Sequence, residues 1–198
     1  MGLRFAKWRA AFEINPTTGV IKENCRILAE YAAISQSAGI VPIVEPEVVY
    51  DGDHDLEACE RATGKVLDEL FRALNRRGVN LKACILKCNM ILAGKDFNEQ
   101  STPDEVGRAT ARVLRAHVPS KLAGIVFLSG GQTPEQATGD LKAVSKRKPF
   151  PWGGTFLFSR ALQGPALEAW NGDNGNRVAA WNALSDRLAA NTDALDNA

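Results

Sequence analysis

The stretch "CILKCNMIL", Cys84–Leu92, is an apolar run with a lysine, Lys87, near its centre. Its dense apolar content is typical of a β-strand that is buried on both faces of a parallel sheet. A lysine almost never enters such an interior unless its ammonium group is paired or takes part in chemistry. The run therefore predicts a buried strand and indicates a functional role for Lys87. The alternative is a strand-end lysine whose ammonium reaches out to solvent.

Other apolar runs share this character and lie at regular intervals along the chain: Leu3–Ala10, Gly39–Pro46, Ala83–Met90, Ala123–Gly131 and Gly154–Leu162. Segments with helical periodicity separate them, at residues 19–39, 54–78, 102–118 and 133–144, and further helices are expected within Ala161–Trp170 and Arg177–Ala190. This alternation predicts an α/β fold with a parallel sheet and right-handed crossovers. A doubly wound sheet and a TIM barrel both satisfy it.

Two of the expected helices carry start signals in the sequence. Thr102, Pro103 and Glu105 fit a capping box with proline in the first turn, and residues 133–136 repeat the pattern. The acidic segment "DGDHD", residues 51–55, has the composition of a metal loop but lacks the EF-hand pattern, so a helix N-cap is favoured.

Composition and charge exclude several classes of partner. The 198 residues carry a net charge of +1, which gives no electrostatic reason to expect nucleic acid or a membrane surface as the main partner. No run is long and apolar enough to predict a membrane span or a signal peptide. The four cysteines lack zinc spacing, so free thiols, no metal and a cytoplasmic location are expected. The common nucleotide-binding fingerprints are absent after the first strand.

Polar side chains gather where the predicted strands end. Side chains alternate along a strand, so Lys7 shares a face with Arg9, Glu45 with Glu47, and Lys87 with Asn89. In a TIM barrel these strand ends line the site of chemistry. A lysine in apolar surroundings and near another cation loses its proton more easily, and can then attack a carbonyl carbon to form a Schiff base. A nearby glutamate can shuttle protons.

The last two strands are followed by groups that suit a phosphate. Ser129, Gly130 and Gly131 offer a hydroxyl and backbone N–H groups, and Ser159 with Arg160 follows the fifth run. Such a site is typical of the loops after strands seven and eight of a barrel. A plain tight turn at residues 129–131 is the alternative.

Five motifs together resemble the class I, Schiff-base fructose-bisphosphate aldolases: "FAKWR" (5–9), "VPIVEPE" (41–47) with "DGDHDLE" (51–57), "LKCNM" (86–90), "FLSGG" (127–131) and "SRALQGPALEAW" (159–170). The resemblance implies a TIM (β/α)8 barrel in which the first run here is similar to the family's fourth strand. The chain is therefore expected to form a single partial-barrel domain, residues 1–198, with about five βα units, strands four to eight. The family's first three βα units and its C-terminal tail have no counterpart.

The resemblance implies a role for each polar strand end. Lys87 resembles the Schiff-base lysine, Glu45 the acid/base glutamate, and Glu47 a glutamate that orients the lysines. Lys7 resembles the lysine beside the sugar hydroxyls and Arg9 the arginine near the distal phosphate. The C1-phosphate site is similar at Ser129, Gly130, Gly131, Ser159 and Arg160. The implied enzyme is a cytoplasmic, homotetrameric lyase of glycolysis that cleaves fructose 1,6-bisphosphate reversibly, without a metal or cofactor.

The sequence departs from the family in three places. Cys88 replaces the proline of LKPNM, and Leu157, Phe158 and Ser159 replace the S-Y-G before the arginine, so an altered phosphate site is expected. The family's aspartate base and another lysine, from its first three strands, have no match. Two readings stay open: an aldolase that is catalytic when its pocket is complete, and a non-catalytic half-barrel or pseudoenzyme that acts by associating with a partner.

Overall fold

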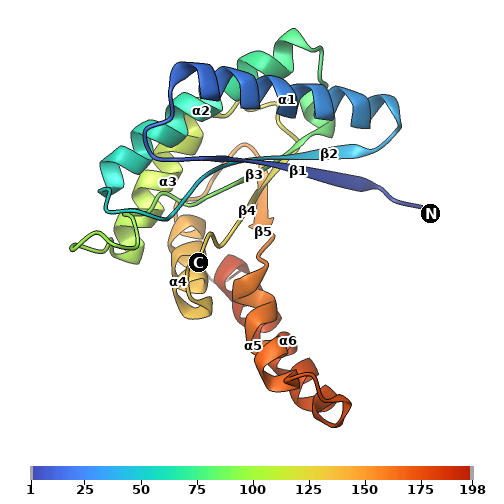
Figure 1. Cartoon of the computed structure of the whole chain (residues 1–198), viewed down its shortest axis with the longest axis vertical. Helices are drawn as coiled ribbons and strands as arrows, with labels where there is room; N and C mark the ends of the chain where they lie inside the picture. The colour runs from blue at the N-terminus through green and yellow to red at the C-terminus, as the bar shows by residue number, and fades with distance from the viewer. Residues whose placement is uncertain (1, 197–198) are drawn as a thin grey trace.

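The computed structural model describes residues 2–196 of the chain. Its single sheet contains five parallel strands in chain order, β1 (Phe5–Phe12), β2 (Val41–Val48), β3 (Ile85–Cys88), β4 (Gly124–Phe127) and β5 (Gly153–Phe156) (Figure 1). Parallel neighbours need long crossovers, and each connection here contains a helix. The α/β fold and the five βα units that the alternation predicts are confirmed.

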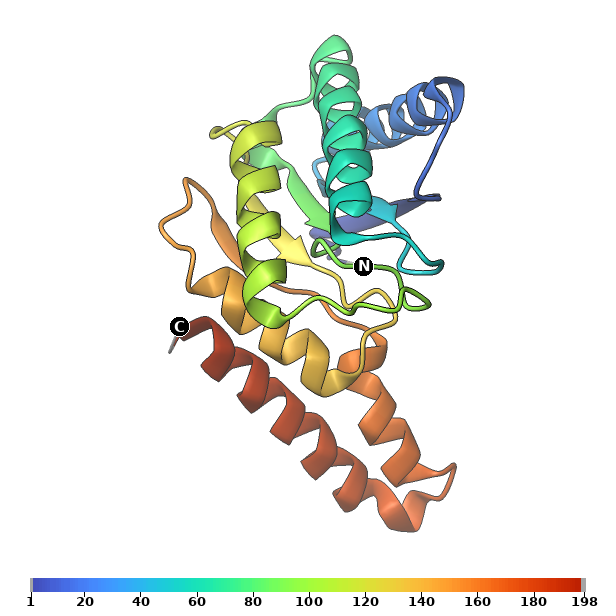
Figure 2. The same ribbon diagram turned by 90° about the vertical axis from the view of Figure 1, so that its left-hand side faces the viewer.

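Helices α1 (Thr18–Ser37), α2 (Leu56–Arg76), α3 (Pro103–His117) and α4 (Pro134–Ser145) pack side by side in chain order along one face of the sheet (Figures 1 and 2). The last two helices, α5 (Arg160–Trp170) and α6 (Arg177–Asp196), form a hairpin that projects from the sheet, and α6 returns to pack against α4. Short 3₁₀ turns lie at Leu81–Ala83 and Asn174–Asn176. Within residues 2–196, no helix is long and apolar enough to cross a membrane.

The two faces of the sheet differ in chemistry. On β1, Ala10 and Phe12 are buried, and the Trp8 ring lies 6.0 Å from that of Tyr31 on α1. These even-numbered side chains therefore face the helices, and Lys7 and Arg9 lie on the opposite face. Each large apolar side chain fully buried between sheet and helices stabilises the fold by about 1.5–3 kcal/mol, and these include Leu28, Leu67, Leu70 and Leu86.

The helix starts follow the signals in the sequence. Thr102 and Glu105 form the reciprocal capping box before α3, as predicted. Thr133 Oγ1 accepts a hydrogen bond from the Gln136 N–H before α4, but the return bond from the Gln136 side chain does not form. Asp55 caps α2 by accepting a hydrogen bond from the Ala58 N–H at 2.7 Å, which confirms the N-cap interpretation of "DGDHD".

The last strand is shorter in the structure than the sequence predicts. The sequence predicts one strand over Gly154–Leu162, but β5 ends at Phe156 and α5 begins at Arg160. The Ser159 carbonyl accepts hydrogen bonds from the N–H groups of Leu162 and Gln163, so the chain has already turned into a helix there. The apolar content of residues 160–162 comes from a helix and not from a strand. At the other end, α6 continues to Asp196, beyond the predicted Ala190.

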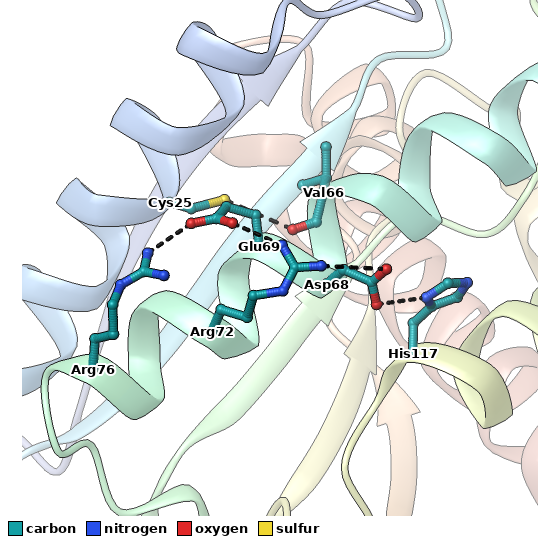
Figure 3. A network of polar contacts seen from close by, with 7 residues as sticks. All are labelled: Cys25, Val66, Asp68, Glu69, Arg72, Arg76 and His117. Atoms are coloured by element: carbon teal, nitrogen blue, oxygen red, sulfur yellow. Dashed lines mark hydrogen bonds and ion pairs between the residues drawn. The ribbon is translucent and has the colours of Figure 1, made fainter.

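A network of polar side chains lies among the helices, on the other side of the sheet from Lys7 and Arg9 (Figure 3). Glu69 on α2 is buried and pairs with Arg76 at 2.6 Å and Arg72 at 2.9 Å, and the hydrogen bond from Arg76 is the main cause that lowers the pKa of Glu69. His117 Nδ1 lies 2.8 Å from Asp68 Oδ1, which ties α3 to α2. The ion pairs of Glu69 lie within α2, and the His117–Asp68 contact joins two helices, so this network has a structural role.

Candidate active site

Glu45 is the centre of the polar face. It lies on β2 with only 3 % of its surface exposed. One carboxylate oxygen, Oε2, is 2.5 Å from Lys7 Nζ on β1, and the other, Oε1, is 3.0 Å from Lys87 Nζ on β3. A single buried carboxylate therefore joins two ammonium groups that come from the strands on either side.

Strand register explains why these three side chains meet. Lys7 is opposite Ile43, and Glu45 lies two residues further along β2 on the same face. Ile43 is also opposite Ile85 on β3, and continuing that register by two residues places Glu45 beside Lys87. The convergence expected from side-chain alternation is thus produced by the parallel register.

A second pair repeats the arrangement one step nearer the strand ends. Arg9 Nε lies 2.5 Å from Glu47 Oε2, and Glu47 is 8 % exposed. The hydrogen bond to Glu47 is the main cause that raises the pKa of Arg9, so this guanidinium stays charged. Within residues 2–196, the ion pair of Glu47 is with Arg9, and its role in orienting the lysines stays a prediction.

Asn89 fixes the geometry at the end of β3. Its Oδ1 accepts a hydrogen bond from the Val48 N–H at 3.1 Å, and its Nδ2 donates to Thr63 Oγ1 at 3.3 Å. The amide therefore ties the ends of β2 and β3 to α2. The prediction that Asn89 shares the face of Lys87 is wrong: β3 ends at Cys88, so strand alternation does not reach Asn89, and its amide turns to Thr63 on α2 in a structural role.

The loop after β4 lies between the second ion pair and the start of α5. Gly130 and Gly131 have φ values of +42° and +89°, which favour glycine, and the Gln132 N–H closes the turn on the Ser129 carbonyl at 2.8 Å. A Cβ placed on Gly130 would lie 3.8 Å from Glu47 Oε1, and one placed on Gly131 would lie 3.8 Å from Arg160 Nη2. Residues 129–131 form a tight turn, which was the alternative interpretation, and Arg160 at the start of α5 lies beside it.

The residues predicted to bind a phosphate differ in exposure. Ser129 is buried, whereas Ser159 and Arg160 are exposed at the start of α5. Ser159 precedes α5 without a side-chain capping bond, so its hydroxyl is not used by the helix. Four cations border this face of the sheet, which suits an anionic substrate: Lys7, Arg9, Lys87 and Arg160. Within the described chain, no three His, Cys, Asp or Glu side chains gather closely enough to hold a metal ion.

Known proteins account for this arrangement. A family model described as "Glycolytic: Fructose-bisphosphate aldolase class-I" matches residues 1–197. The chain belongs to the class I fructose-bisphosphate aldolase family. Fructose-bisphosphate aldolase B from Gallus gallus is 46 % identical over 195 residues, which cover 96 % of this chain and 54 % of the relative. A probable fructose-bisphosphate aldolase class 1 from Xanthomonas campestris is 44 % identical, over 96 % of this chain and 58 % of its own length.

A solved aldolase has the same fold. The Plasmodium falciparum fructose-bisphosphate aldolase, in a crystal with TRAP and a small-molecule inhibitor, superposes with a TM-score of 0.95 at 43 % identity. The match covers 97 % of this chain and 57 % of that one. The chain therefore spans about half the length of the relatives it matches, and its five parallel strands correspond to part of an aldolase barrel.

The sequence interpretation missed the residues behind this site. His54 and Gln132 are buried, and Asp140 on α4 is hydrogen-bonded to Gln132 at 2.6 Å. Gln132 directly follows Gly130 and Gly131, and this position next to a glycine turn is the local signal that could have indicated its role in the loop. His54 lies in a segment whose sequence indicates only a helix cap. Asp140 contacts Gln132, which lies eight residues earlier in the chain, and no sequence pattern predicts this contact.

Proposed function

We propose that this chain supplies the Schiff-base part of a fructose-bisphosphate aldolase site, which reversibly cleaves fructose 1,6-bisphosphate to dihydroxyacetone phosphate and glyceraldehyde 3-phosphate. The observation that carries the proposal is the buried Glu45 carboxylate held between Lys7 Nζ and Lys87 Nζ. An amine and a proton-shuttling carboxylate at 3.0 Å are the two groups that iminium formation requires. Family membership supports the same reaction.

In the proposed mechanism Lys87 is the nucleophile and Glu45 handles its protons. The Lys87 ammonium gives a proton to Glu45, and the free amine attacks the C2 carbonyl of the ketose. Glu45 returns this proton to the C2 oxygen and then carries a second proton from the attached nitrogen to the same oxygen, so that water leaves and an iminium forms between C2 and Lys87. As the C3–C4 bond breaks, its electron pair moves into the iminium while a base takes the C4 hydroxyl proton. In this proposal Lys7, which is half-exposed beside Glu45, binds the sugar hydroxyls.

The remaining polar groups bind the two phosphates in this proposal. Ser129, Gly130 and Gly131, with Arg160 and the exposed Ser159, take the C1 phosphate, and Arg9 takes the distal one. Arg9 is charged and about half of its side chain is exposed, so it can meet an anion while it stays paired with Glu47. The protonated iminium withdraws electrons as a Lewis acid would, so the proposed reaction uses no metal ion or organic cofactor.

Borohydride trapping tests the nucleophile directly. Dihydroxyacetone phosphate is expected to form an iminium with Lys87, which sodium borohydride reduces to a stable secondary amine that peptide mass spectrometry locates. Lys87→Met should abolish the adduct. Lys95→Met is the matched control, because Lys95 is half-exposed and pairs with Asp51 outside the site. An adduct of equal yield in Lys87→Met would refute the assignment.

The free edge of β1 favours a second proposal, in which the chain acts through association. Within residues 2–196, β1 pairs only with β2, and its neighbourhood exposes Leu3, Phe5 and Trp8. An open edge of this kind is a template for another strand. Cleavage of fructose 1,6-bisphosphate should then appear or rise when the first three βα units of a related aldolase are added. Full turnover by the chain alone would reject this second proposal. For the first proposal, family membership further suggests that the enzyme is a cytoplasmic homotetramer.

A further inference from the structure

A small cavity lies behind the Ser129–Gly131 loop, on the side of the β2–α2 and β3–α3 connections. His54, Asn89, Gly130 and Gln132 are among the residues that line it. The centre of a water molecule can move through about 10 Å³ of it, which is about the room that one water needs. The cavity adjoins the candidate active site through Gly130 but contains none of the side chains assigned to the reaction.

His54 brings an unsatisfied imidazole to this cavity. The residue is 8 % exposed, and neither ring nitrogen has a hydrogen-bond partner. Its carbonyl accepts a 2.7 Å hydrogen bond from the Gly94 N–H, and a Cβ placed on Gly94 would lie only 2.9 Å from Nδ1. Nδ1 therefore packs against the backbone of Gly94, and Nε2 is the ring nitrogen that is left to bind a ligand. Burial lowers the pKa of His54 against the opposing carboxylates of Asp55 and Asp53, so the ring is neutral.

Gln132 brings a second unsatisfied group to the same cavity. It is 5 % exposed, and its Nε2 donates to Asp140 Oδ2 at 2.6 Å. Its Oε1 is buried without a partner. A buried polar atom that lacks its hydrogen bond costs about 1–3 kcal/mol. Both residues line the same water-sized space, and an imidazole nitrogen with an amide oxygen suits a ligand that both donates and accepts hydrogen bonds.

We propose that one water molecule occupies this cavity, donates a hydrogen bond to Gln132 Oε1, exchanges a second with His54 Nε2, and so positions the Ser129–Gly131 loop. His54 and Gln132 are positioning residues in this arrangement, because they act on the loop and not on the substrate. The bridge joins the β2–α2 connection to the β4–α4 connection. Within residues 2–196, the one hydrogen bond that the Gln132 side chain otherwise makes is to Asp140.

The loop has a physical need for such a tether. Both of its glycines adopt positive φ values, and glycine loses more conformational freedom on ordering than any other residue. Gln132 closes the turn through its backbone N–H, so fixing its side chain fixes the turn. Phosphate binding by the ordered loop rests on the proposed function. The bound water and the ordering of the loop do not depend on it.

Water counting and histidine NMR test the bridge. The chain has two histidines, so the variant His117→Asn leaves His54 as its single imidazole, and it also serves as the control outside the cavity. Its ¹⁵N spectrum should show a neutral ring with a nuclear Overhauser effect to a long-lived water. Water-¹⁷O relaxation dispersion should count one long-lived water fewer in His54→Phe and in Gln132→Met than in His117→Asn. Equal counts in all three variants would overturn the proposal.

Hydrogen exchange tests the positioning. The amides of Gly130 and Gly131 should exchange about 2- to 10-fold faster in His54→Phe and Gln132→Met, with α1 amides unchanged. The double variant should exchange no faster than the faster single variant, because both remove one bridge. The inference would be overturned if the two rate increases multiplied in the double variant, or if the exchange rates of the Gly130 and Gly131 amides did not change. Binding of inorganic phosphate should weaken in parallel, and a parent chain that binds none would refute the proposed phosphate site without affecting the water and loop readouts.

Discussion

Lys87 Nζ lies 3.0 Å from Glu45 Oε1, and both residues are more than nine-tenths buried. Two buried charges repay their desolvation only when their remaining hydrogen-bonding positions are also satisfied. Here the second carboxylate oxygen contacts Lys7, so Glu45 uses both oxygens and the ammonium of Lys87 has an anion inside an otherwise apolar strand. This relationship explains how a lysine can lie in the middle of "CILKCNMIL".

Replacing that carboxylate should slow Schiff-base formation while leaving the strands in place. Glu45→Gln keeps the shape of the side chain but removes the proton acceptor of Lys87, and a positioned acid or base typically contributes about 10²–10⁴-fold to a rate. We expect a loss of this size in the initial rate of borohydride-trapped adduct with dihydroxyacetone phosphate. Glu57→Gln, on the exposed start of α2, is the control. A Glu45→Gln rate equal to that of the control would contradict the role of Glu45.

The thiol next to Lys87 should not compete with it for a carbonyl. Burial raises the pKa of Cys88 to about 12, and it does the same for Cys25 and Cys84. Burial also raises the pKa of Cys59. The thiolate is the reactive form, so all four cysteines should react with a disulfide reagent at pH 8 only slowly in the native chain. Rapid release of all four is expected in denaturant, and a fast native thiol would show that the strand around Cys88 opens.

The parts that sequence reasoning predicts are those governed by local rules. Apolar runs and helix caps place the strands and helices, and side-chain alternation puts Lys7 with Arg9 and Glu45 with Glu47 on one face of their own strands. The actual contacts depend on strand register, which relates residues about forty positions apart, and this pairs Glu47 with Arg9. The water-sized cavity at His54 depends on three loops packing together, a relationship that no single stretch of sequence encodes.

Arg160 should contribute to phosphate binding through charge. Its guanidinium nitrogen lies 3.8 Å from the Cβ position of Gly131, so an anion on the loop would be within its reach. Hydrogen bonds to charged groups contribute about 1.5–3 kcal/mol, so Arg160→Gln should weaken binding of inorganic phosphate by about 10- to 150-fold. Calorimetric titration at low salt measures this, with the exposed Arg61→Gln on α2 as the control. Identical affinities would remove Arg160 from the site.

Asp140 should make the stability of the chain depend on pH. Burial raises the pKa of its carboxyl group from 3.8 to about 7, against the opposing hydrogen bond from Gln132. Because the folded state holds this proton more tightly than the unfolded state, the stabilising contribution is complete below pH 4 and is lost as the pH rises through 7. The loss amounts to at most about 4 kcal/mol, at 1.36 kcal/mol for each unit of pKa shift.

The variant Asp140→Asn isolates this contribution. The asparagine cannot ionise, yet its side-chain oxygen can still accept the hydrogen bond from Gln132 Nε2. Urea unfolding should therefore find the variant more stable than the parent chain at pH 8, with the difference shrinking as the pH falls toward 4. A difference that is constant across this range would mean that the Asp140 carboxyl group titrates alike in the folded and unfolded chain. It would then follow that Gln132 is held by an ordinary carboxylate and not by a buried acid.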